Sequence, residues 1–588
     1  MNAELVLKHF DRIGGAPDAI PRLRRFILDL AVRGKLVESD PADELASDLL
    51  NRIRAEKTRL IRQGDIPKQK SLPPIEDSEI PIILPDNWCW VRLNDITSYI
   101  QRGKSPTYAS DDGFPVISQK CVQWNGLALE FAKRITRDSI KTYDDIRFLR
   151  DGDLLWNSTG TGTIGRIVRI ASPPSKLICD SHVTVVRCLV VDAEYVRSWL
   201  RSDNVYGSIE NRAAGSTNQV ELTSQMAINQ VVPLPPITEQ HRIVAKVDEL
   251  MALCDRLQEA EEERENRRDR LAAVSHHHVN NGVNADTFRV GANFYVGNLQ
   301  SLTTRPDQIK QLRQTILNLA VRGKLVQQNC GEGSTVELLK CISAENANLQ
   351  KAKGIRAQKS APPAESFESK TVIPTTWVHA YLQDLAYLVT DGTHLTPRYT
   401  DQGRPFLSAQ NVKPFRFMPE KHRFVSDLDF ENYRSNRKPE RGDVLLTRVG
   451  AGIGEAAVLD SDFEFAFYVS LCLIKIPTRF LSPKFLVLWL NSPEGRDSST
   501  VRTYGKGASQ GNLNLGLIRT FKVPLPPLAE QLRIVARVDE LMALCDKLEV
   551  QLTTAQTETS RLLEAVLHHA INGVDKIPQL GAHREGVK

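Results

Sequence analysis

One long stretch of this chain occurs twice. Residues 232–257 read VPLPPITEQHRIVAKVDELMALCDRL and residues 523–548 read VPLPPLAEQLRIVARVDELMALCDKL, so the copies lie 291 residues apart and agree at 21 of 26 positions. Such a period is far too long for a solenoid repeat and indicates a duplicated domain. The chain must therefore fold into two halves built on one plan.

Each copy predicts a long helix that begins after a pair of prolines. Proline fixes φ and restricts the residue before it, so Pro235-Pro236 favours an extended approach to the helix. Thr238 is then expected to be the N-cap. Glu239 and Glu530 stand at the positive end of the helix dipole, where a carboxylate is favourable.

Apolar residues recur along both helices in steps of four and three, which is a heptad pattern. The positions are Ile243, Val247, Leu250, Cys254 and Leu257 in the first copy, and Ile534, Val538, Leu541, Cys545 and Leu548 in the second. The second pattern continues to Val566, whereas the charged run 259–270 interrupts the first until Leu271 restores it. About 40 residues of helix would span roughly 60 Å. Pairing of the two helices within one chain is favoured over a dimerisation arm, which needs no internal duplication.

A second duplicated element precedes each long helix. Residues 27–37 read ILDLAVRGKLV and residues 316–326 read ILNLAVRGKLV, with ten of eleven identical. Each predicts an amphipathic helix that ends at Gly34 or Gly323. We call these the head helices.

Further segments connect the head helices to the rest of each half. A second helix is expected at about 42–63, and its counterpart at 334–353 is degraded in sequence. Polar, proline-containing connectors then lead to the tryptophan-bearing strands NWCWVRL and TTWVHAYL. The link between halves, about 280–307, has no helical period and predicts a flexible crossover.

The blocks 88–235 and 377–526 differ much more than their flanks. Both have Gly, Pro, Asn and Asp between short β-branched runs, which predicts mixed α/β domains with irregular loops. Three segments nevertheless recur at matching places: 117–127 with 407–417, 151–170 with 441–459, and 213–222 with 505–514. This arrangement indicates one scaffold that presents two different recognition surfaces.

Composition excludes several classes of protein. The 588 residues are 41% hydrophobic and 25% charged, with a net charge of +5 that permits nucleic-acid binding. No apolar run is long enough to span a membrane, and the N-terminus does not resemble a signal peptide. The nine cysteines fall singly without zinc-ligand spacing, as expected for reduced thiols in a cytoplasmic protein. We expect no metal site.

Two phosphate-binding motifs are imitated but incomplete. Residues 160–165 read GTGTIG, yet a strand and a proline turn follow where a dinucleotide site needs a helix. Gly103-Lys104-Ser105 resembles the end of a Walker A loop, but Ser98 stands where its first glycine belongs. The paired prolines never occur in an adenine-methyltransferase context. We therefore identify no catalytic residue.

Taken together, the two duplicated elements and the stretches GDLLWNSTGTGTIG and GDVLLTRVGAGIG resemble the specificity subunits of type I restriction–modification systems over nearly the whole chain. The resemblance implies an α+β protein: two mixed α/β target-recognition domains separated by a pair of long antiparallel helices, with an internal pseudo-twofold duplication. The corresponding ranges are 1–84 for an N-terminal helical segment, 85–236 for the first recognition domain, 237–283 for the central helix, 284–373 for the crossover and second head, 374–527 for the second recognition domain, and 528–588 for the C-terminal helix and tail.

The resemblance also implies partners. They are double-stranded DNA, two modification subunits that carry S-adenosylmethionine and the adenine-N6 chemistry, and two restriction subunits that translocate and cleave DNA. S-adenosylmethionine, ATP and Mg²⁺ would belong to these partners, and this non-catalytic chain would bind no cofactor. It would recognise an asymmetric bipartite site, one half-site per domain, with the spacer set by the helix pair and the half-sites roughly 34 Å apart. The alternatives are a self-sufficient methyltransferase or nuclease, and a coiled-coil scaffold.

Candidate DNA contacts combine a glycine or turn context with planar or cationic side chains that pair with base edges or phosphates. They are Arg102, Lys104, Gln119, Lys120, Asn157, Ser158, Thr159, Arg166, Asn218 and Gln219 in the first block, and Gln410, Asn411, Lys413, Thr447, Arg448, Ser509 and Gln510 in the second. The alternative for each is a turn cap or a solvated charge. We call the duplicated stretches, 27–37 with 232–257 and 316–326 with 523–548, the frames. Arg242 and Arg533 lie on these near-identical frames and are expected to bind the two modification subunits, unless they pair with neighbouring acids.

Overall fold

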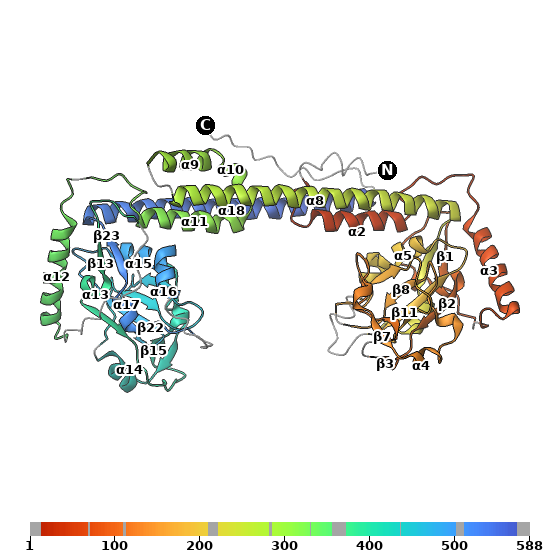
Figure 1. Cartoon of the computed structure of the whole chain (residues 1–588), viewed down its shortest axis with the longest axis horizontal. Helices are drawn as coiled ribbons and strands as arrows, with labels where there is room; N and C mark the ends of the chain where they lie inside the picture. The colour runs from red at the N-terminus through yellow and green to blue at the C-terminus, as the bar shows by residue number, and fades with distance from the viewer. Residues whose placement is uncertain are drawn as a thin grey trace. The chain divides into compact units, whose positions relative to one another are not determined.

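The computed structural model describes residues 13–68, 71–109, 113–160, 162–207, 209, 221–281, 285–329, 331–355, 372–435, 437–500 and 511–572. The chain divides into two compact units. Unit 1 comprises residues 1–264 and 556–588, and unit 2 comprises residues 265–555. Two 45-residue helices, α8 (Ile237–Asn281) and α18 (Leu528–Asn572), contribute residues to both units (Figure 1).

Unit 1 contains two four-stranded sheets. The first is antiparallel, in the order β2 (Thr97–Arg102), β11 (Val183–Cys188), β8 (Leu154–Asn157) and β9 (Ile167–Arg169). The second has the order β10 (Ile178–Cys179), β4 (Phe114–Ile117), β7 (Lys133–Ile135) and β3 (Tyr108–Ala109), with β10 and β4 parallel. The remaining strands form two ladders: β1 (Cys89–Arg92) with β12 (Val231–Leu234), and β5 (Val122–Gln123) with β6 (Gly126–Leu127). The helices are α2 (Ala19–Val32), α3 (Ala46–Gln63), α4 (Arg137–Ile140), α5 (Ala193–Arg201) and α7 (Ser224–Asn229).

Unit 2 repeats this topology strand for strand, except that it has no named counterpart of β3 among its described residues. Its sheets are β14 (Leu388–Asp391), β22 (Leu471–Lys475), β19 (Val444–Thr447) and β20 (Ala456–Val458), then β18 (Arg423–Val425), β15 (Arg404–Leu407) and β21 (Ala466–Phe467). The ladders are β13 (Val378–Tyr381) with β23 (Lys522–Leu525), and β16 (Val412–Lys413) with β17 (Arg416–Phe417). The helices are α9 (Ala285–Gly297), α10 (Leu299–Leu302), α11 (Pro306–Val321), α12 (Thr335–Ala352), α13 (Leu382–Leu385), α14 (Asp427–Arg434), α15 (Pro483–Asn491), α16 (Pro493–Thr500) and α17 (Leu515–Arg519). The predicted α+β class and internal duplication are confirmed.

A central strand in each unit divides two hydrophobic cores. Successive side chains of a strand point to opposite faces, so Leu154 and Trp156 of β8 enter the core that contains Trp199 of α5, whereas Leu155 enters the core that contains Ile117. Strand β19 repeats this arrangement with Val444 and Leu446 on one side and Leu445 on the other. We call the core that holds Trp199, and its counterpart in unit 2, the helix-side cores, and the other two the loop-side cores.

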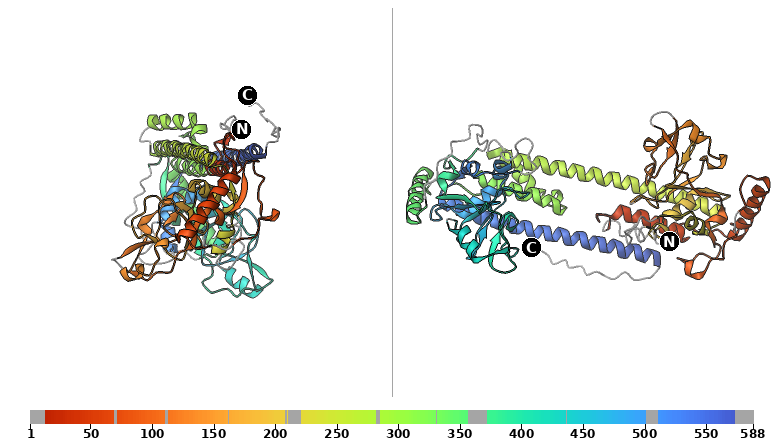
Figure 2. Two further views of the ribbon diagram at one scale, coloured as in Figure 1. Left: turned by 90° about the vertical axis from the view of Figure 1, so that its right-hand side faces the viewer. Right: turned by 90° about the horizontal axis from the view of Figure 1, so that it is seen from below.

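In unit 1 the head helix α2 joins both long helices in one cluster, with Ile27 of α2 beside Ile243 and Val566. Figure 2 shows α2 lying between α8 and the end of α18. Near the start of α2, Arg24 pairs with Asp255 at 2.6 Å, and just beyond its end Lys35 donates to the Ile571 carbonyl at 2.6 Å. These contacts attach the unit 1 portions of α8 and α18 to one head helix, which confirms pairing within the chain.

Gly34 and Gly323 follow the head helices in the left-handed region, with φ of +66° and +65°. A Cβ at Gly34 would lie 2.5 Å from a Pro85 carbon, and one at Gly323 would lie 2.4 Å from a Pro374 carbon. Both the backbone conformation and the lack of space require glycine. The predicted ends of the head helices are therefore confirmed.

Three sequence-based predictions are wrong. Leu271 is 51% exposed, and Ala272 and Val279 are buried instead, because α8 packs on α9 and α11 in unit 2 and turns a different face inward. The link 280–307 is largely helical, and Tyr295 and Leu302 are buried in it. Thr238 is not an N-cap: α8 begins at Ile237, and the Thr238 hydroxyl donates to Asp43. The helix expected at 334–353 is confirmed despite its degraded sequence, since α12 is as long as its counterpart α3.

Candidate nucleic-acid interface

The first turns of the two long helices are held by matching buried side chains. Glu239 accepts a hydrogen bond from Asn87 at 3.0 Å, and Glu530 accepts one from the Trp377 indole at 3.0 Å. Burial raises the pKa of both carboxyl groups. Gln240 and Gln531 accept from the Asp192 and Ser482 backbone at 2.9 and 2.8 Å. The duplicated Glu-Gln pair at the start of each long helix therefore attaches that helix to its own domain.

Arg242 and Arg533, the predicted partner-binding residues, are engaged within the chain. Arg242 donates two hydrogen bonds to Asp43, and Arg533 pairs with Glu332. Asp43 and Glu332 are 289 residues apart, so the ion pair itself is duplicated. The side chains of the two arginines remain 37% and 39% exposed. Each arginine links a long helix to the segment after its head helix. This favours the alternative that the two arginines pair with neighbouring acidic residues over the prediction that they bind partner subunits.

In unit 1 the glycine-containing loop between β8 and β9 is closed by internal hydrogen bonds. The Asn157 amide donates to the carbonyls of Gln119 and Thr163 at 3.0 and 3.2 Å, and Thr159 bonds His182 at 2.7 Å. Arg166 donates to the Gln123 side chain and to a loop carbonyl, each at 2.7 Å. The loop joins two strands of one sheet, as expected for a structure without a dinucleotide fold.

The aligned loop of unit 2 is supported by different side chains. Arg448 is 5% exposed, forms an ion pair with Asp391, and donates to the Leu513 carbonyl at 2.9 Å. The Asn411 amide donates to the carbonyls of Met418 and Lys421 at 2.9 and 2.8 Å. Thr447 is fully buried.

Several candidate DNA contacts are buried in this structure. Their contact with DNA stays a prediction, and those at most 5% exposed are Asn157, Ser158, Thr159, Asn411, Thr447 and Arg448. Arg166 is half-buried and spans the loop and the β5–β6 hairpin. Arg102 is also half-buried and pairs with Glu221 at 3.2 Å.

Other candidates lie on the surface. Lys104, Lys120, Gln410 and Lys413 are exposed, and Gln119 is half-buried. Asn218, Gln219, Ser509 and Gln510 lie outside the described residues and stay predictions.

The three recurring segments of each block converge. In unit 1 the second segment bonds the first through Asn157, and the Leu222 amide of the third donates to the Ser158 carbonyl at 2.8 Å. In unit 2 the Leu513 amide donates to the Arg448 carbonyl at 2.9 Å, which brings the third segment to the second in the same way. Each unit thus presents one loop cluster.

Sequence reasoning missed a tyrosine–cation pair that occurs in both units. Lys133 Nζ lies 4.5 Å from the ring centre of Tyr108, and the Arg423 guanidinium lies 4.5 Å from that of Tyr399. Both rings are 45% exposed and both cations are exposed. A sequence signal was available: Gly103 follows β2, Gly392 follows the matching strand β14, and each tyrosine comes a few residues later.

These two glycines have one physical reason. A Cβ at Gly103 would lie 2.1 Å from the Cys179 carbonyl oxygen of β10, and one at Gly392 would lie 2.2 Å from the Phe467 carbonyl oxygen of β21. The chain crosses these strands too closely for any side chain. Gly103 therefore serves packing and not a phosphate cradle.

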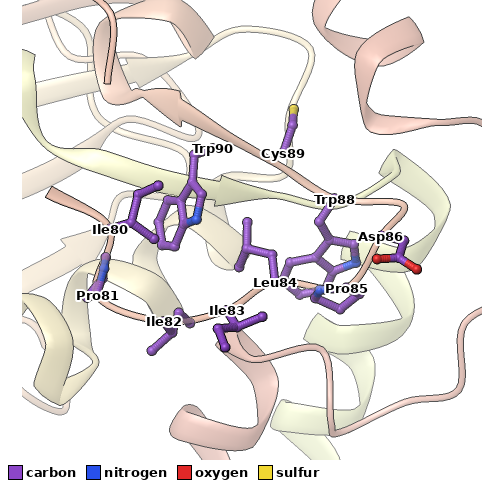
Figure 3. Close-up of a pocket in the computed structure, with 10 residues that line it drawn as sticks. All are labelled: Ile80, Pro81, Ile82, Ile83, Leu84, Pro85, Asp86, Trp88, Cys89 and Trp90. Carbon is purple, nitrogen blue, oxygen red and sulfur yellow. The ribbon is translucent and has the colours of Figure 1, made fainter. Parts of the chain in front are cut away.

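A cavity of about 550 Å³ lies beside β1 in unit 1 (Figure 3). Its walls are the apolar segment Ile80–Pro85 together with Trp88, Cys89 and Trp90, and its one carboxylate belongs to Asp86. Among the described residues of this mostly apolar lining, the titratable side chains are Asp86 and Cys89. Among the described residues, no helix is both long and apolar enough to cross a membrane.

Comparison with known proteins identifies the family. The family described as "Type I restriction modification DNA specificity domain" matches residues 85–265 and 374–555. The specificity subunits of the type I restriction enzymes EcoAI and EcoEI of Escherichia coli are 30% and 27% identical over 574 and 567 residues, and each alignment covers 94% of both chains. The chain therefore belongs to the family of type I restriction–modification specificity subunits. The solved HsdS subunit of Thermoanaerobacter tengcongensis is 19% identical, with a TM-score of 0.40 over 84% of this chain and 99% of that chain.

Proposed function

We propose that this chain recognises an asymmetric bipartite DNA site and directs partner subunits to it without catalysing a reaction itself. The observation that carries the proposal is the pair of topologically matching units whose loop clusters differ in their side chains. Because the scaffolds match and the loops differ, each unit reads its own half-site, and the two half-sites differ in sequence.

The contact residues follow from exposure. In unit 1 we assign phosphate and base contacts to Lys104, Gln119, Lys120 and the Tyr108–Lys133 pair; in unit 2, to Gln410, Lys413 and the Tyr399–Arg423 pair. A cation against a tyrosine face keeps its charge at a fixed place, which suits contact with a phosphate.

The proposed partners are two modification subunits and two restriction subunits. They would carry S-adenosylmethionine, ATP and Mg²⁺, the methylation of adenine, and the cleavage of DNA. Support comes from the duplicated frames, since two copies of one partner require two similar surfaces. The long helices would hold the two recognition domains apart and set the spacer.

Binding assays on the complex with the modification subunits test this function. The target is first obtained by mapping methylated adenines in the host genome. Lys120→Ala and Lys413→Ala should each weaken binding and lower the salt dependence by about one phosphate contact. Base-pair substitutions in a half-site should act independently of changes in the other. A chain that methylates DNA alone, or two half-sites sensitive to the same unit, would contradict the proposal.

A further inference from the structure

An aromatic residue occupies the tip of a fixed hairpin in unit 2. Strands β16 and β17 pair Val412 with Phe417 and Lys413 with Arg416, which leaves Pro414-Phe415 as a two-residue turn. Phe415 has a φ of +64°. Proline followed by a residue of positive φ is the arrangement of a type II turn, in which glycine is the usual third residue.

This conformation is unfavourable for phenylalanine, because a Cβ in the left-handed region crowds the backbone. The turn is nevertheless held in place: the Phe415 amide donates to the Ala456 carbonyl of β20 at 3.0 Å, and the Met418 amide donates to the Asn411 carbonyl at 2.9 Å. A bulky residue kept in a strained, anchored turn points to a function that requires its side chain.

The Phe415 ring is available to a partner molecule. It is 45% exposed, whereas Phe417 in the next strand packs on Phe465 at 5.5 Å within the loop-side core. Lys413 and Arg416, on either side of the turn, are exposed cations. An apolar ring between two cations suits a duplex, because the cations meet phosphates while the ring meets the base stack.

Unit 1 carries the same hairpin with an aromatic residue at its turn. Strands β5 and β6 pair Val122 with Leu127 and Gln123 with Gly126 around Trp124-Asn125. Trp124 is 38% exposed and meets the Tyr206 ring edge-on at 4.9 Å. An exposed aromatic residue therefore occurs in both turns, although the two turns differ in sequence.

We infer that Phe415 acts as an apolar wedge that enters the base stack of the half-site read by unit 2. The inference rests on the proposed function and adds a specificity contact that depends on DNA deformability. Partial unstacking favours flexible pyrimidine–purine steps, so Phe415 would select a base step without hydrogen bonds.

Phe415→Gly provides a test with opposed readouts, because glycine removes both the ring and the strain. In the complex with the modification subunits, this variant should bind its target about 10- to 100-fold more weakly, while non-specific DNA binding stays within about twofold and the melting temperature is unchanged or raised. With 2-aminopurine placed in the half-site read by unit 2, the wild-type complex should raise the fluorescence of the probe by unstacking it. Phe415→Gly should abolish this rise. Phe415→Trp should retain that rise, and Leu428→Ala, at an aliphatic residue 74% exposed on α14, should bind normally.

Wild-type binding and unstacking by Phe415→Gly would overturn the wedge alone, since the complex would still recognise its target. A lowered melting temperature with equal loss of specific and non-specific binding would make Phe415 a structural residue and also overturn it. If the wild-type complex fails to select the target at all, the proposed function fails together with the wedge.

Discussion

The guanidinium of Arg448 pairs with the carboxylate of Asp391 in the interior of unit 2, where unit 1 has Ser158 bonded to Thr184 at 2.5 Å. Asp391 immediately precedes Gly392, and at the aligned place unit 1 has Arg102 before Gly103. The two loop clusters therefore stand on interiors of different chemistry. In unit 2, removal of Arg448 leaves the buried Asp391 carboxylate with His394, 3.0 Å away, as its described partner.

Arg448→Ala should consequently destabilise unit 2 by up to about 3–5 kcal/mol, because the buried Asp391 carboxylate loses its guanidinium partner and keeps only the contact with the exposed His394 among its described ion pairs. Its effect on DNA should follow the loss of folded protein and disappear at low temperature. Lys413→Ala, at an exposed cation, should weaken DNA binding at unchanged stability. Thermal unfolding and DNA affinity measured on both variants separate these cases, and a fully stable Arg448→Ala would contradict the structure.

The Arg242–Asp43 pair should couple the long helix to the segment after the head helix. Both groups are partly shielded and the Asp43 pKa is lowered by the hydrogen bond from Arg242, so we expect a coupling energy of about 1 kcal/mol in a double-mutant cycle. The Lys246–Glu249 pair, which is exposed on α8, is the control and should show less. Charge reversal of Arg242 and Arg533 together should weaken assembly with the modification subunits only as far as it loosens the frames. Loss of assembly with intact stability would instead restore these arginines as direct contacts.

Seven residues inserted in register into both α8 and α18 should lengthen the accepted spacer by about three base pairs. Seven helical residues add roughly 10 Å, and one base pair of DNA rises about 3.4 Å. Selection from a library with random spacers measures the change. Altered half-site sequences, or an unaltered spacer, would show that the helices do not set the distance.

Alkaline pH should stabilise unit 1 through Lys57. Burial lowers the pKa of this ammonium group to about 8, and the group donates a hydrogen bond to the Asn94 carbonyl. The folded state releases this proton before the unfolded state does, so the free energy of unfolding should rise between about pH 8 and 10.5, by at most about 3 kcal/mol. Lys57→Met should lack that rise. Parallel stability curves for the two proteins over this range would contradict the lowered pKa.

Sequence patterns predicted the frames of this fold because those residues obey local rules. Ile243 and Val566, which belong to the heptad patterns of the long helices, are buried, and Gly34 and Gly323 end the head helices. The candidate site was harder to predict, since Asn157 and Arg448 have the polar chemistry of base contacts while long-range packing buries them. The interaction of Tyr399 with Arg423 was also invisible, because strand register and not sequence spacing brings them together.

Strands β8 and β19 separate the two hydrophobic cores of each recognition domain. The loop segments contribute to both cores: Ile117 and Leu407 lie in the loop-side cores, whereas Ile164, Leu222, Ile453 and Leu513 lie in the helix-side cores, which are continuous with the duplicated frame. Exchange of a whole recognition domain would therefore keep each loop on the core residues it packs against, because the loops rest on both cores. Substitution of a loop alone would leave its new side chains above an interior that was formed for different ones.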